Sequence, residues 1–595
     1  MKNALTSLLL CLLAFFTTVN ADAQGWQWAR HIVNTPFAVS SSQAGLATDT
    51  SGNIISATII SGFSTLLGGV TSTFGTHSIV DSANTSQVII TKTDRNGNVL
   101  WATASQHTGT GITNITTDKE GNAYIMGVYD STNCTFGSYP LSHAPLPAPC
   151  NTMYFIAKIN PAGSVVWTKN IVPTSSFGYG GGTMAMMYVP VGSIKADDSG
   201  HLYVTGTFNT PSITIGTTTL PLSGLQSIFI AKYDTAGNPL WAKTYGSTGT
   251  DYVRTIELTK NGQLYMTGNY YSSSISFGPY TISNGANKGT YLAKFDNGGN
   301  ALWAKTTDSF MYMRDLAVDT VANVYVCGNF SADSVSFDSH WITNTSIGHS
   351  DGFIVKYNDA GTVLWAKSMG GDSSDKAEKI ALDNCGNVFI TGSSSYFYAT
   401  PGGYYLHFDD DTRYLGIQGP FSYPMFIAHY NDAGQFLNCF GRYGGGANPA
   451  LIATDNKGSF FINTQHTNSP DTFGTNVLVR DSGQFYQFIA KFDYDSSGCI
   501  PYTFPPVLKV IEQQVIGVSL FPNPVTTEFY LQSDIAFQTG SAAIITDMMG
   551  RQISVTPLSG KRATISTNAL APGLYNCIIN MQAAGILYKK VVIVQ

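Results

Sequence analysis

Apolar and polar residues alternate in short runs along most of the chain, and turns rich in Asp, Asn and Gly separate these runs. Residues 123–127, for example, alternate directly after the turn at residues 118–122. Side chains two residues apart point to the same face of a β-strand, so each run predicts a strand. The turn residues accept local backbone hydrogen bonds or adopt positive φ, as hairpins require. The pattern therefore predicts an all-β protein.

One unit of runs and turns recurs seven times along the chain. An opening turn leads into an alternating strand, then into a strand that reads Phe-Ile-Ala-Lys (residues 155–158 and 229–232), then into a strand that carries Trp (Trp167 and Trp241). Four strands per unit is the natural count, and the spacing of roughly 60 to 80 residues leaves room for loops. The opening turns contain Asp49, Asp118, Asp198, Asn261, Asp319, Asp383 and Asp455.

The repeat predicts a closed ring of sheets. A sheet with two apolar faces cannot bury both by itself, whereas sheets arranged around an axis cover one another. We therefore expect a seven-bladed β-propeller over residues 24–502.

The seventh unit has its strand at residues 488–493 but no Trp-bearing strand after it, while residues 26–30 match that missing phrase. We expect this N-terminal strand to complete the last sheet. Asn438 occupies the Trp position of the sixth unit, which predicts less apolar packing there.

The pattern changes at the C-terminal end of the repeats. Residues 503–517 contain Pro505 and Pro506 followed by polar residues, which is typical of a linker. From residue 518 onward, about 80 residues of short alternating runs predict a small Ig-like β-sandwich over residues 518–595. The runs cover residues 529–532, 542–546, 552–556, 563–566, 574–581 and 587–594.

The N-terminus combines Lys2, an apolar stretch at residues 8–16, and the small residues Ala21 and Ala23. This order is typical of a signal peptide, so we expect residues 1–23 to be removed on export. No later stretch approaches the roughly 20 apolar residues of a membrane-spanning helix. The mature chain is expected to have no transmembrane segment.

Charge and cysteine usage narrow the expected partners. The chain has 31 Lys and Arg against 37 Asp and Glu, a formal net charge of −6. Nucleic acid is not an expected partner, because there is no basic excess to neutralise phosphates.

In an exported protein disulfides can form, and spacing favours Cys134–Cys150, with Cys439–Cys499 as a weaker guess. No cysteine lies in a zinc-binding spacing, and no metal or other cofactor is expected.

The sequence contains no recognisable catalytic constellation. Ser350 lies in a Gly-x-Ser-x-Gly pattern, but a repeat strand follows where a nucleophile elbow needs a helix. Asp residues from several units could still meet in a central channel and act on a polysaccharide. The Asp-rich turns lack the bidentate Glu of calcium loops, so we interpret them as hairpin turns, with calcium binding as the alternative. The few glutamates are Glu120, Glu257, Glu378, Glu512 and Glu528.

The sixth unit contains a long excursion in which aromatic residues stand next to carboxylates. Such a loop could stack against sugar rings or hold a cation, and loops carry binding sites more often than scaffolds do. The alternative is that the insertion packs its own aromatics over the blade edge. The candidate binding residues are Tyr396, Tyr398, Tyr404, Tyr405, His407, Asp409, Asp410 and Asp411.

Two resemblances follow from these motifs. The phrases Asp-x-x-Gly-Asn-x-Tyr-x-x-Gly and Phe-Ile-Ala-Lys-Tyr-Asp-x-x-Gly-x-x-Leu-Trp resemble the SBBP-type seven-bladed propeller repeat, which implies an exported propeller and no particular activity. The C-terminal segment resembles the type A sorting domain of the type IX secretion system. The landmarks of that resemblance are Phe521, Pro522, Asn523, Pro524, Gly550, Gly573, Tyr575, Lys589 and Lys590.

The sorting resemblance implies a partner and a location. The partner would be the type IX secretion machinery, and the protein would be secreted or held on the outer-membrane surface of a Gram-negative bacterium of Bacteroidota type. We expect a monomeric, non-catalytic propeller that binds an extracellular protein or glycan through its loops. The alternative is an extracellular polysaccharide hydrolase or lyase that uses channel Asp residues.

Overall fold

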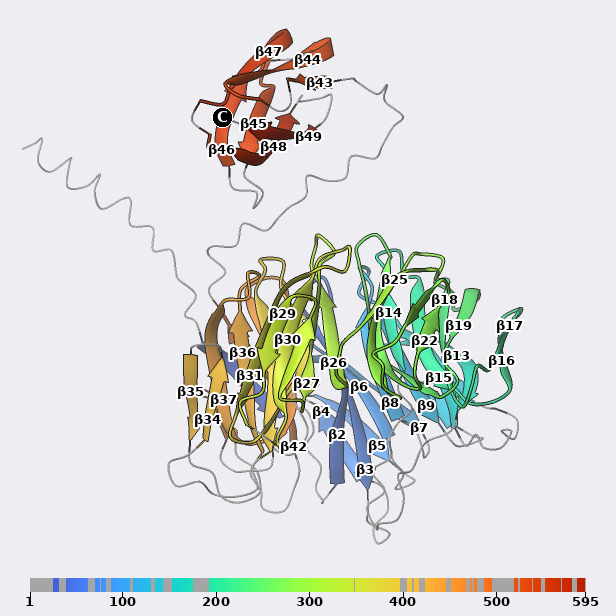
Figure 1. Cartoon of the computed structure of the whole chain (residues 1–595). Coiled ribbons are helices and arrows are strands. Elements are labelled where there is room, and N and C mark those ends of the chain that lie inside the picture. Colours follow the sequence, from blue (N-terminus) through green and yellow to red (C-terminus); the bar gives the residue numbers. More distant parts are fainter. Residues whose placement is uncertain are drawn as a thin grey trace, which may run out of the picture. The chain divides into compact units, whose positions relative to one another are not determined.

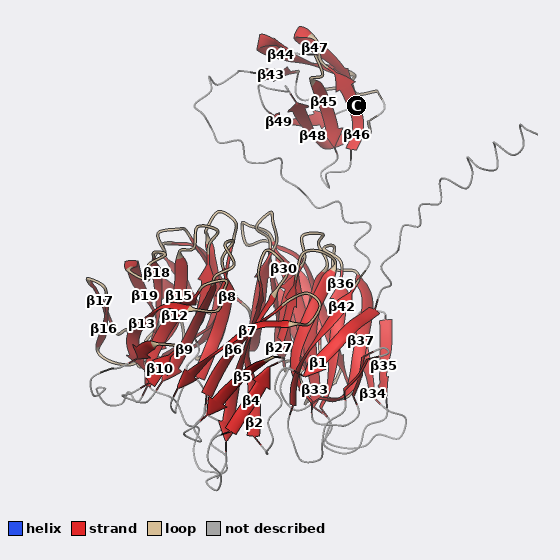
Figure 2. Cartoon of the chain, turned by 180° about the vertical axis from the view of Figure 1, so that it is seen from behind, coloured by secondary structure: helices blue, strands red, loops and turns tan. Residues whose placement is uncertain are grey.

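The computed structural model describes residues 25–31, 39–62, 70–74, 76–81, 87–106, 111–129, 134–141, 143, 152–174, 192–346, 348–395, 404–408, 411–416, 423–445, 451–466, 471–473, 476–478, 486–494, 518–522, 525–537, 539–546, 552–568, 570–580 and 586–593. Every regular element in these residues is a β-strand (Figure 2). The all-β prediction is confirmed. The chain divides into two compact units, residues 1–502 and 503–595.

The first unit repeats one antiparallel four-stranded pattern (Figure 1). The inner strands are β2 (Val39–Thr48), β8 (Gly111–Thr117), β14 (Ser193–Ala196), β20 (Thr250–Leu258), β26 (Met311–Val318), β32 (Ser374–Leu382) and β38 (Leu451–Thr454). The second strands are β3 (Ile54–Gly62), β9 (Ala123–Tyr129), β15 (Leu202–Phe208), β21 (Leu264–Tyr271), β27 (Val324–Phe330), β33 (Val388–Ser395) and β39 (Ser459–His466).

The third strands carry the Phe-Ile-Ala-Lys phrase or its variants, and the fourth strands carry the Trp. The third strands are β6 (Gln87–Thr93), β12 (Thr152–Ile159), β18 (Ser227–Tyr233), β24 (Gly289–Phe295), β30 (Asp351–Tyr357), β36 (Tyr423–Tyr430) and β42 (Tyr486–Asp493). The fourth strands are β7 (Val99–Gln106), β13 (Val165–Thr174), β19 (Pro239–Tyr245), β25 (Ala301–Thr306), β31 (Val363–Gly371), β37 (Phe436–Gly445) and β1 (Gly25–His31).

Each unit also has a hairpin between its second and third strands. Two of these hairpins extend the sheet of the preceding unit, because β10 pairs with β7 and β34 pairs with β31. The hairpins are β4 (Val70–Phe74) with β5 (His77–Asp81), β10 (Cys134–Phe136) with β11 (Tyr139–Leu141), β16 (Ser212–Ile215) with β17 (Thr218–Pro221), β22 (Ile275–Phe277) with β23 (Tyr280–Ile282), β28 (Ser334–Phe337) with β29 (His340–Thr343), β34 (Tyr404–Phe408) with β35 (Asp411–Gly416), and β40 (Asp471–Phe473) with β41 (Asn476–Leu478).

The N-terminal strand completes the last sheet, as the sequence predicted. β1 pairs antiparallel with β42, from Gly25 opposite Asp493 to His31 opposite Phe488. Consecutive inner strands lie next to one another, and β38 lies next to β2, so the series returns to its start. The Thr48 hydroxyl, at the end of β2, donates a hydrogen bond to the Thr454 carbonyl of β38 at 2.7 Å.

Apolar clusters fill the spaces between successive sheets. Tyr203 and Ile230, for example, pack with Val253 and Met266 of the following sheet. Burying both faces of every sheet in this way removes apolar area that one sheet alone would expose. Between the last and first sheets the cluster contains Phe461 and Ile489 together with Ile54 and Ile89.

In every unit but the sixth, the repeated Trp joins its sheet to the next. Trp241 of β19 donates its indole N–H to the carbonyl of Asn297 at 3.1 Å, and Asn297 lies in the turn before β25 of the following sheet. A Cβ on Gly299 of that turn would lie 2.6 Å from the Trp241 ring, so the turn needs Gly where the indole packs. The same bond links Trp28 to Arg95, Trp101 to Pro161, Trp167 to Thr235, Trp303 to Asp359, and Trp365 to Asp432.

The sixth unit departs from the repeat at two paired positions. Asn438 stands where the other units have Trp, and it is exposed. It lies opposite His429 of β36, which stands where the other units have Lys. The His429 ring stacks on Phe389 with ring centroids 4.5 Å apart, and its Nε2 lies 2.9 Å from Asn387 Oδ1. Burial lowers the pKa of His429 to about 4, although Asp383 opposes this shift.

This partly buried imidazole should make the repeat domain sensitive to acid. The pKa of His429 is lower in the folded than in the unfolded state, so its contribution to stability is present above about pH 6.5 and is lost as pH falls toward 4. A shift of this size corresponds to at most about 3 kcal/mol. We expect His429→Gln, which cannot titrate, to reduce the loss of urea stability between pH 7.5 and pH 4.5. An unchanged pH dependence in this variant would show that other groups control acid unfolding.

The cysteine pairs expected from spacing are wrong. Cys134 and Cys439 both carry thiols. Cys134 is buried at the start of β10, where it belongs to the same apolar cluster as Phe136 and Leu141. Cys385, in the opening turn of the sixth unit, is disulfide-bonded instead.

The second unit consists of two antiparallel sheets around one apolar core. The core includes Phe529 and Ile565 from one sheet and Ile545 and Ile579 from the other. One sheet contains β43 (Val518–Phe521), β44 (Glu528–Phe537) and β47 (Gly560–Ser566), and the other contains β46 (Gln552–Pro557), β45 (Ala542–Thr546), β48 (Gly573–Asn580) and β49 (Ile586–Ile593). In the described part of the chain, no helix has the length and apolarity needed to cross a membrane.

Candidate functional site

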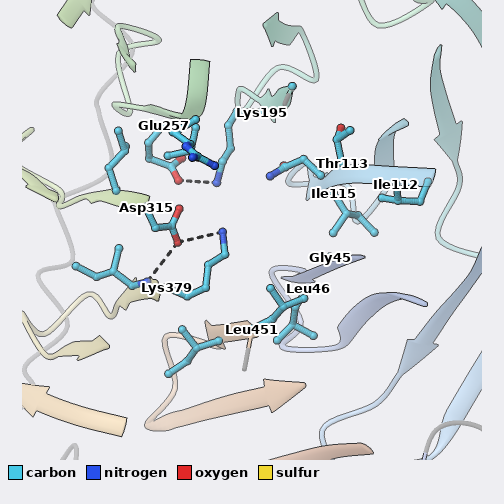
Figure 3. Close-up of a pocket in the computed structure, with 17 residues that line it drawn as sticks. Gly45, Leu46, Ile112, Thr113, Ile115, Lys195, Glu257, Asp315, Lys379 and Leu451 are labelled. Atoms are coloured by element: carbon cyan, nitrogen blue, oxygen red, sulfur yellow. Dashed lines mark hydrogen bonds and ion pairs between the residues drawn. The ribbon is translucent and has the colours of Figure 1, made fainter. Parts of the chain in front are cut away.

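The inner strands enclose a cavity of about 400 Å³ (Figure 3). All seven inner strands, or the residues next to them, contribute to its lining. A cavity lined by every unit can differ in charge from one side to the other, although the scaffold repeats. We therefore consider this channel cavity as the candidate functional site.

A β-bulge shapes the wall of the cavity in five of the units. The register shifts at equivalent places in β2, β8, β20, β26 and β32. In β20 the shift falls between Val253 and Thr255, so Arg254 is the extra residue. Arg254 and Glu257 then both line the cavity, although strict alternation would place them on opposite faces.

One side of the cavity is charged, and ion pairs join neighbouring inner strands there. Lys195 Nζ of β14 lies 2.5 Å from Glu257 Oε2 of β20. Lys379 Nζ of β32 lies 3.8 Å from Asp315 Oδ2 of β26, and this carboxylate also accepts a hydrogen bond from the backbone N–H of Ile380 at 3.3 Å (Figure 3). A third pair between the same two strands, outside the residues that line the cavity, joins Arg314 to Glu378 at 2.8 Å.

The other side of the cavity is lined by small or apolar residues. Gly45, Leu46 and Ile115 line it in Figure 3, and Leu451 and Ile452 continue it. A Cβ on Gly45 would lie 2.5 Å from Ile115, so this wall is closely packed. The cavity therefore presents an ionic face opposite an apolar one.

Ion pairs engage charged side chains that line the cavity. Burial lowers the pKa of Lys195, but the Glu257 carboxylate outweighs this effect, so the pKa of Lys195 lies above its ordinary value. An ammonium whose pKa is raised gives up its proton less readily, and general acid catalysis needs a proton to give. Asp315 and Glu378 are also in ion pairs, and within the described residues no group of three His, Cys, Asp or Glu could hold a metal ion.

A second hollow, of about 420 Å³, lies among the opening turns. Its carboxylates include Asp49, Asp118 and Asp455. Lys92 Nζ lies 2.8 Å from Asp49 Oδ2, and Arg95 Nη2 lies 2.6 Å from Asp455 Oδ2. Burial raises the pKa of Asp49, but the hydrogen bonds from Lys92 and Asn53 more than offset this, and the net pKa is lowered.

These Asp side chains also close their own turns. Asp118 Oδ1 accepts the backbone N–H of Asn122 at 2.9 Å, and Asp118 Oδ2 accepts the Asn122 side-chain amide at 2.7 Å. Such bonds are what an Asx-type hairpin turn needs. Calcium binding at these turns stays an untested alternative.

The predicted binding loop of the sixth unit is only partly described. Tyr396, Tyr398, Asp409 and Asp410 lie outside the described residues, and Tyr404 lies on β34. Tyr405 is 46% exposed, whereas Phe408 is buried and stacks on Phe436 with ring centroids 4.5 Å apart. His407 Nδ1 lies 2.9 Å from the Thr412 hydroxyl, and Asp411 begins β35. The loop thus packs alternate side chains into the core, and its binding role stays a prediction.

The sorting landmarks that the structure describes lie on strands of the second unit or next to them. Phe521 ends β43, and its peptide bond to Pro522 is cis. The Arg562 guanidinium lies over both Phe521 and Tyr530, at 5.4 and 4.1 Å from the ring centroids. Gly573 begins β48, and the Tyr575 hydroxyl donates to the Ala571 carbonyl at 2.8 Å. Lys589 and Lys590 lie on β49, and Asn523, Pro524 and Gly550 lie outside the described residues.

Sequence reasoning missed most of the channel charges. Glu257 and Glu378 were noticed only because Glu is rare in this chain. Lys195, Arg254, Asp315 and Lys379 were not singled out. The signal that could have found them is that they lie a few residues before an opening turn. Asp315 and Lys379 stand at the position where other units have Gly45, Asn114 or Leu451.

Comparisons with known proteins identify the C-terminal unit. Residues 519–594 match the family described as the secretion system C-terminal sorting domain. This match indicates export through a type IX secretion system, to the outside or the surface of a cell of Bacteroidota type.

The rest of the chain has distant similarities. An uncharacterized WD repeat-containing protein of Acanthamoeba polyphaga mimivirus is 24% identical over 491 residues, and the match covers 69% of this chain and 34% of that protein. The chain thus spans about a third of that relative.

Two solved structures are also similar to the chain. A protein of unknown function from Dyadobacter fermentans has a TM-score of 0.32 at 10% identity, covering 64% of this chain and 93% of that one. PorZ of Porphyromonas gingivalis, a surface component of the type IX secretion system, has a TM-score of 0.22 at 11% identity, covering 94% and 82%. Both scores are too low to indicate a shared fold.

Proposed function

We propose that this protein is an exported, non-catalytic seven-bladed β-propeller of the SBBP type that binds an extracellular glycan or protein through its surface loops. The type IX machinery recognises its C-terminal sorting domain, and residues 1–23 are removed on the way. The mature protein carries out its role as a monomer, released or attached to the outer-membrane surface.

The sorting-domain match is the observation that carries the export part of this proposal. It covers residues 519–594, nearly all of the described second unit. The arrangement of inner strands supports the propeller, because β38 returns to β2 and β1 pairs with β42.

The ion pairs of the channel cavity support binding over turnover. Glu257 and Asp315, which line the cavity, each lie within 3.8 Å of a Lys nitrogen. A hydrolase or lyase of the alternative kind needs carboxylates placed to exchange protons with a substrate. These carboxylates instead hold neighbouring inner strands together.

Secretion of a truncated chain tests the export proposal. We expect a type IX-competent host to release or display the full chain, and to retain a chain that ends at residue 517 inside the cell. Immunoblots of medium, surface-protease-treated cells and periplasm measure the difference. Release of the truncated chain at the level of the full one would contradict it.

A turnover assay tests the absence of catalysis. The exported protein is incubated with polygalacturonate and with laminarin, and new reducing ends are measured. We expect none above the background of the Asp315→Asn variant. Turnover that this substitution abolishes would establish the hydrolase or lyase alternative.

A further inference from the structure

Four aromatic side chains from two neighbouring units form a continuous row, which we call the aromatic strip. The strip contains Tyr252 near the start of β20, Tyr271 at the end of β21, Phe310 just before β26, and Tyr312 on β26. Ring centroids are 5.9 Å apart for Tyr252 and Tyr271, 6.0 Å for Tyr271 and Phe310, and 5.1 Å for Phe310 and Tyr312. Antiparallel pairing brings the end of β21 beside the start of β20, which explains why these residues meet.

The strip is open to solvent. Tyr271 is 41% exposed and Tyr312 is 37% exposed, while Tyr265 and Tyr291 of the same sheet are fully buried. Large aromatic side chains that serve only to stabilise the fold are usually buried. Exposed aromatics gathered in one place are a feature of recognition surfaces.

The repeat itself shows that the scaffold does not need these rings. The residue equivalent to Tyr252 is Ser42 in the first unit, Gly111 in the second and Lys376 in the sixth, each identified by the same strand register. The residue equivalent to Tyr271 is Ser61, Asn209, Ser331 or Ser395 in other units. Those units form the same sheets with small or polar residues. Folding therefore does not explain why aromatic residues occupy these positions in the strip.

Positive charge lies over two of the rings. Lys288 Nζ is 4.5 Å from the Phe310 ring centroid, and Arg314 Cζ is 6.0 Å from that of Tyr312. Arg314 is held by Glu378 and by Asn329 Oδ1 at 2.7 Å, whereas Lys288 is exposed. Lys288 is therefore the cation that an incoming anionic group can approach.

Hydroxyl-bearing residues adjoin one member of the strip in the chain. Ser272, Ser273 and Ser274 follow Tyr271 directly in the chain. A protein partner would need a broad apolar centre within about 800 Å² per side. A narrow row of aromatic rings instead suits a chain of sugar rings, whose C–H faces pack on aromatic rings and whose hydroxyls need hydrogen-bond partners.

We propose that the aromatic strip binds an acidic polysaccharide. The C–H faces of successive sugar rings pack on Tyr271, Phe310 and Tyr312, and Lys288 pairs with a sugar carboxylate. This inference rests on the proposed binding function and gives it a site and a ligand class, at a place distinct from the sixth-unit loop.

Affinity electrophoresis of the exported full chain in native gels tests this site. Polygalacturonate is the acidic probe and laminarin the neutral one. We expect polygalacturonate to retard the wild-type protein, with less retardation at high salt. The Tyr271→Ala/Tyr312→Ala double variant should bind at least about tenfold more weakly. Lys288→Gln should weaken binding of polygalacturonate and remove most of its salt dependence.

Matched variants separate binding from folding. Tyr280 on β23 is 38% exposed in the same unit and lies outside the strip, so Tyr280→Ala should bind like wild type. Tyr271→Leu/Tyr312→Leu keeps apolar bulk without an aromatic face and should also lose binding. Unchanged thermal midpoints in both double variants exclude unfolding as the cause.

Each contrary outcome has a distinct meaning. No retardation of the wild type, or a preference for laminarin, would overturn the acidic polysaccharide as ligand. Equal retardation of wild type and double variants would overturn the site but leave the proposed binding function standing, through another surface. A further contrary outcome is that the double variants retain polygalacturonate and lose binding to a surface protein. That outcome would make the strip a protein-binding site and contradict the proposal.

Discussion

A mature chain that lacks residues 25–31 should fail to form a stable repeat domain. β1 supplies the fourth strand of the last sheet, and six of its residues pair with β42. Its Trp28 donates to the Arg95 carbonyl of the first sheet at 2.9 Å and packs against Phe461 with ring centroids 6.2 Å apart. Trp28 is partly buried, so losing it costs up to about 3–5 kcal/mol, and each strand hydrogen bond adds about 1 kcal/mol. The sum is comparable to the whole stability of a domain, about 5–15 kcal/mol.

Thermal unfolding followed by circular dichroism and limited proteolysis measures this effect. A chain with residues 25–31 in shuffled order is the matched control, because it has the same length and composition, and we expect it to be as unstable as the deletion. A synthetic peptide of residues 24–33 added to the deleted chain should restore protease resistance. Cooperative unfolding of the deleted chain at the wild-type temperature would show that the ring does not need β1.

The sequence predicted the scaffold because the scaffold repeats. The Leu-Trp-Ala-Lys phrase returns at a fixed place in the unit, so the isolated match at residues 26–30 indicated the missing strand of the last sheet. The structure gives a physical reason for the phrase, since each Trp bonds to a turn of the next sheet, as Trp241 does to Asn297. Signals of this kind are local and recur, which is why one chain suffices to detect them.

The candidate site could not be predicted in the same way, because it depends on what differs between units. Alternation places Arg254 and Glu257 on opposite faces of β20, and only the register shift between Val253 and Thr255 brings both into the cavity. The aromatic strip depends on Tyr271 and Phe310, which are far apart in the chain and meet only because two neighbouring sheets pack together.

Cysteine pairing failed for a related reason. Cys134 and Cys150 were matched by their short separation, but Cys134 faces the apolar core from β10. Separation along the chain says nothing about which face of a strand a thiol occupies, whereas disulfide geometry depends on that direction.

Gly328→Ala should be among the most damaging single substitutions in the repeat domain. A Cβ on Gly328 would lie 1.9 Å from the Tyr312 carbonyl oxygen and 2.9 Å from the Phe353 ring. The carbonyl belongs to backbone next to the bulge between Met313 and Asp315, so it cannot move without breaking the pairing of β26 with β27. We expect a loss of about 3 kcal/mol or more in the free energy of unfolding.

The same substitution at Gly298 is the matched control. Gly298 lies in an exposed turn, and an added Cβ would approach only the side chains of Asn300 and Asp296, at 3.3 and 3.4 Å. Removing glycine there restricts the unfolded chain, so Gly298→Ala should be neutral or stabilising by up to about 1 kcal/mol. Urea unfolding of both variants measures the contrast. The same contact would form at four other glycines, where a Cβ would also meet an aromatic ring of the third strand: Gly127, Gly206, Gly268 and Gly392. Equal stability of Gly328→Ala and Gly298→Ala would contradict this steric explanation. The Gly that recurs at the Gly328 position would then have no structural cause.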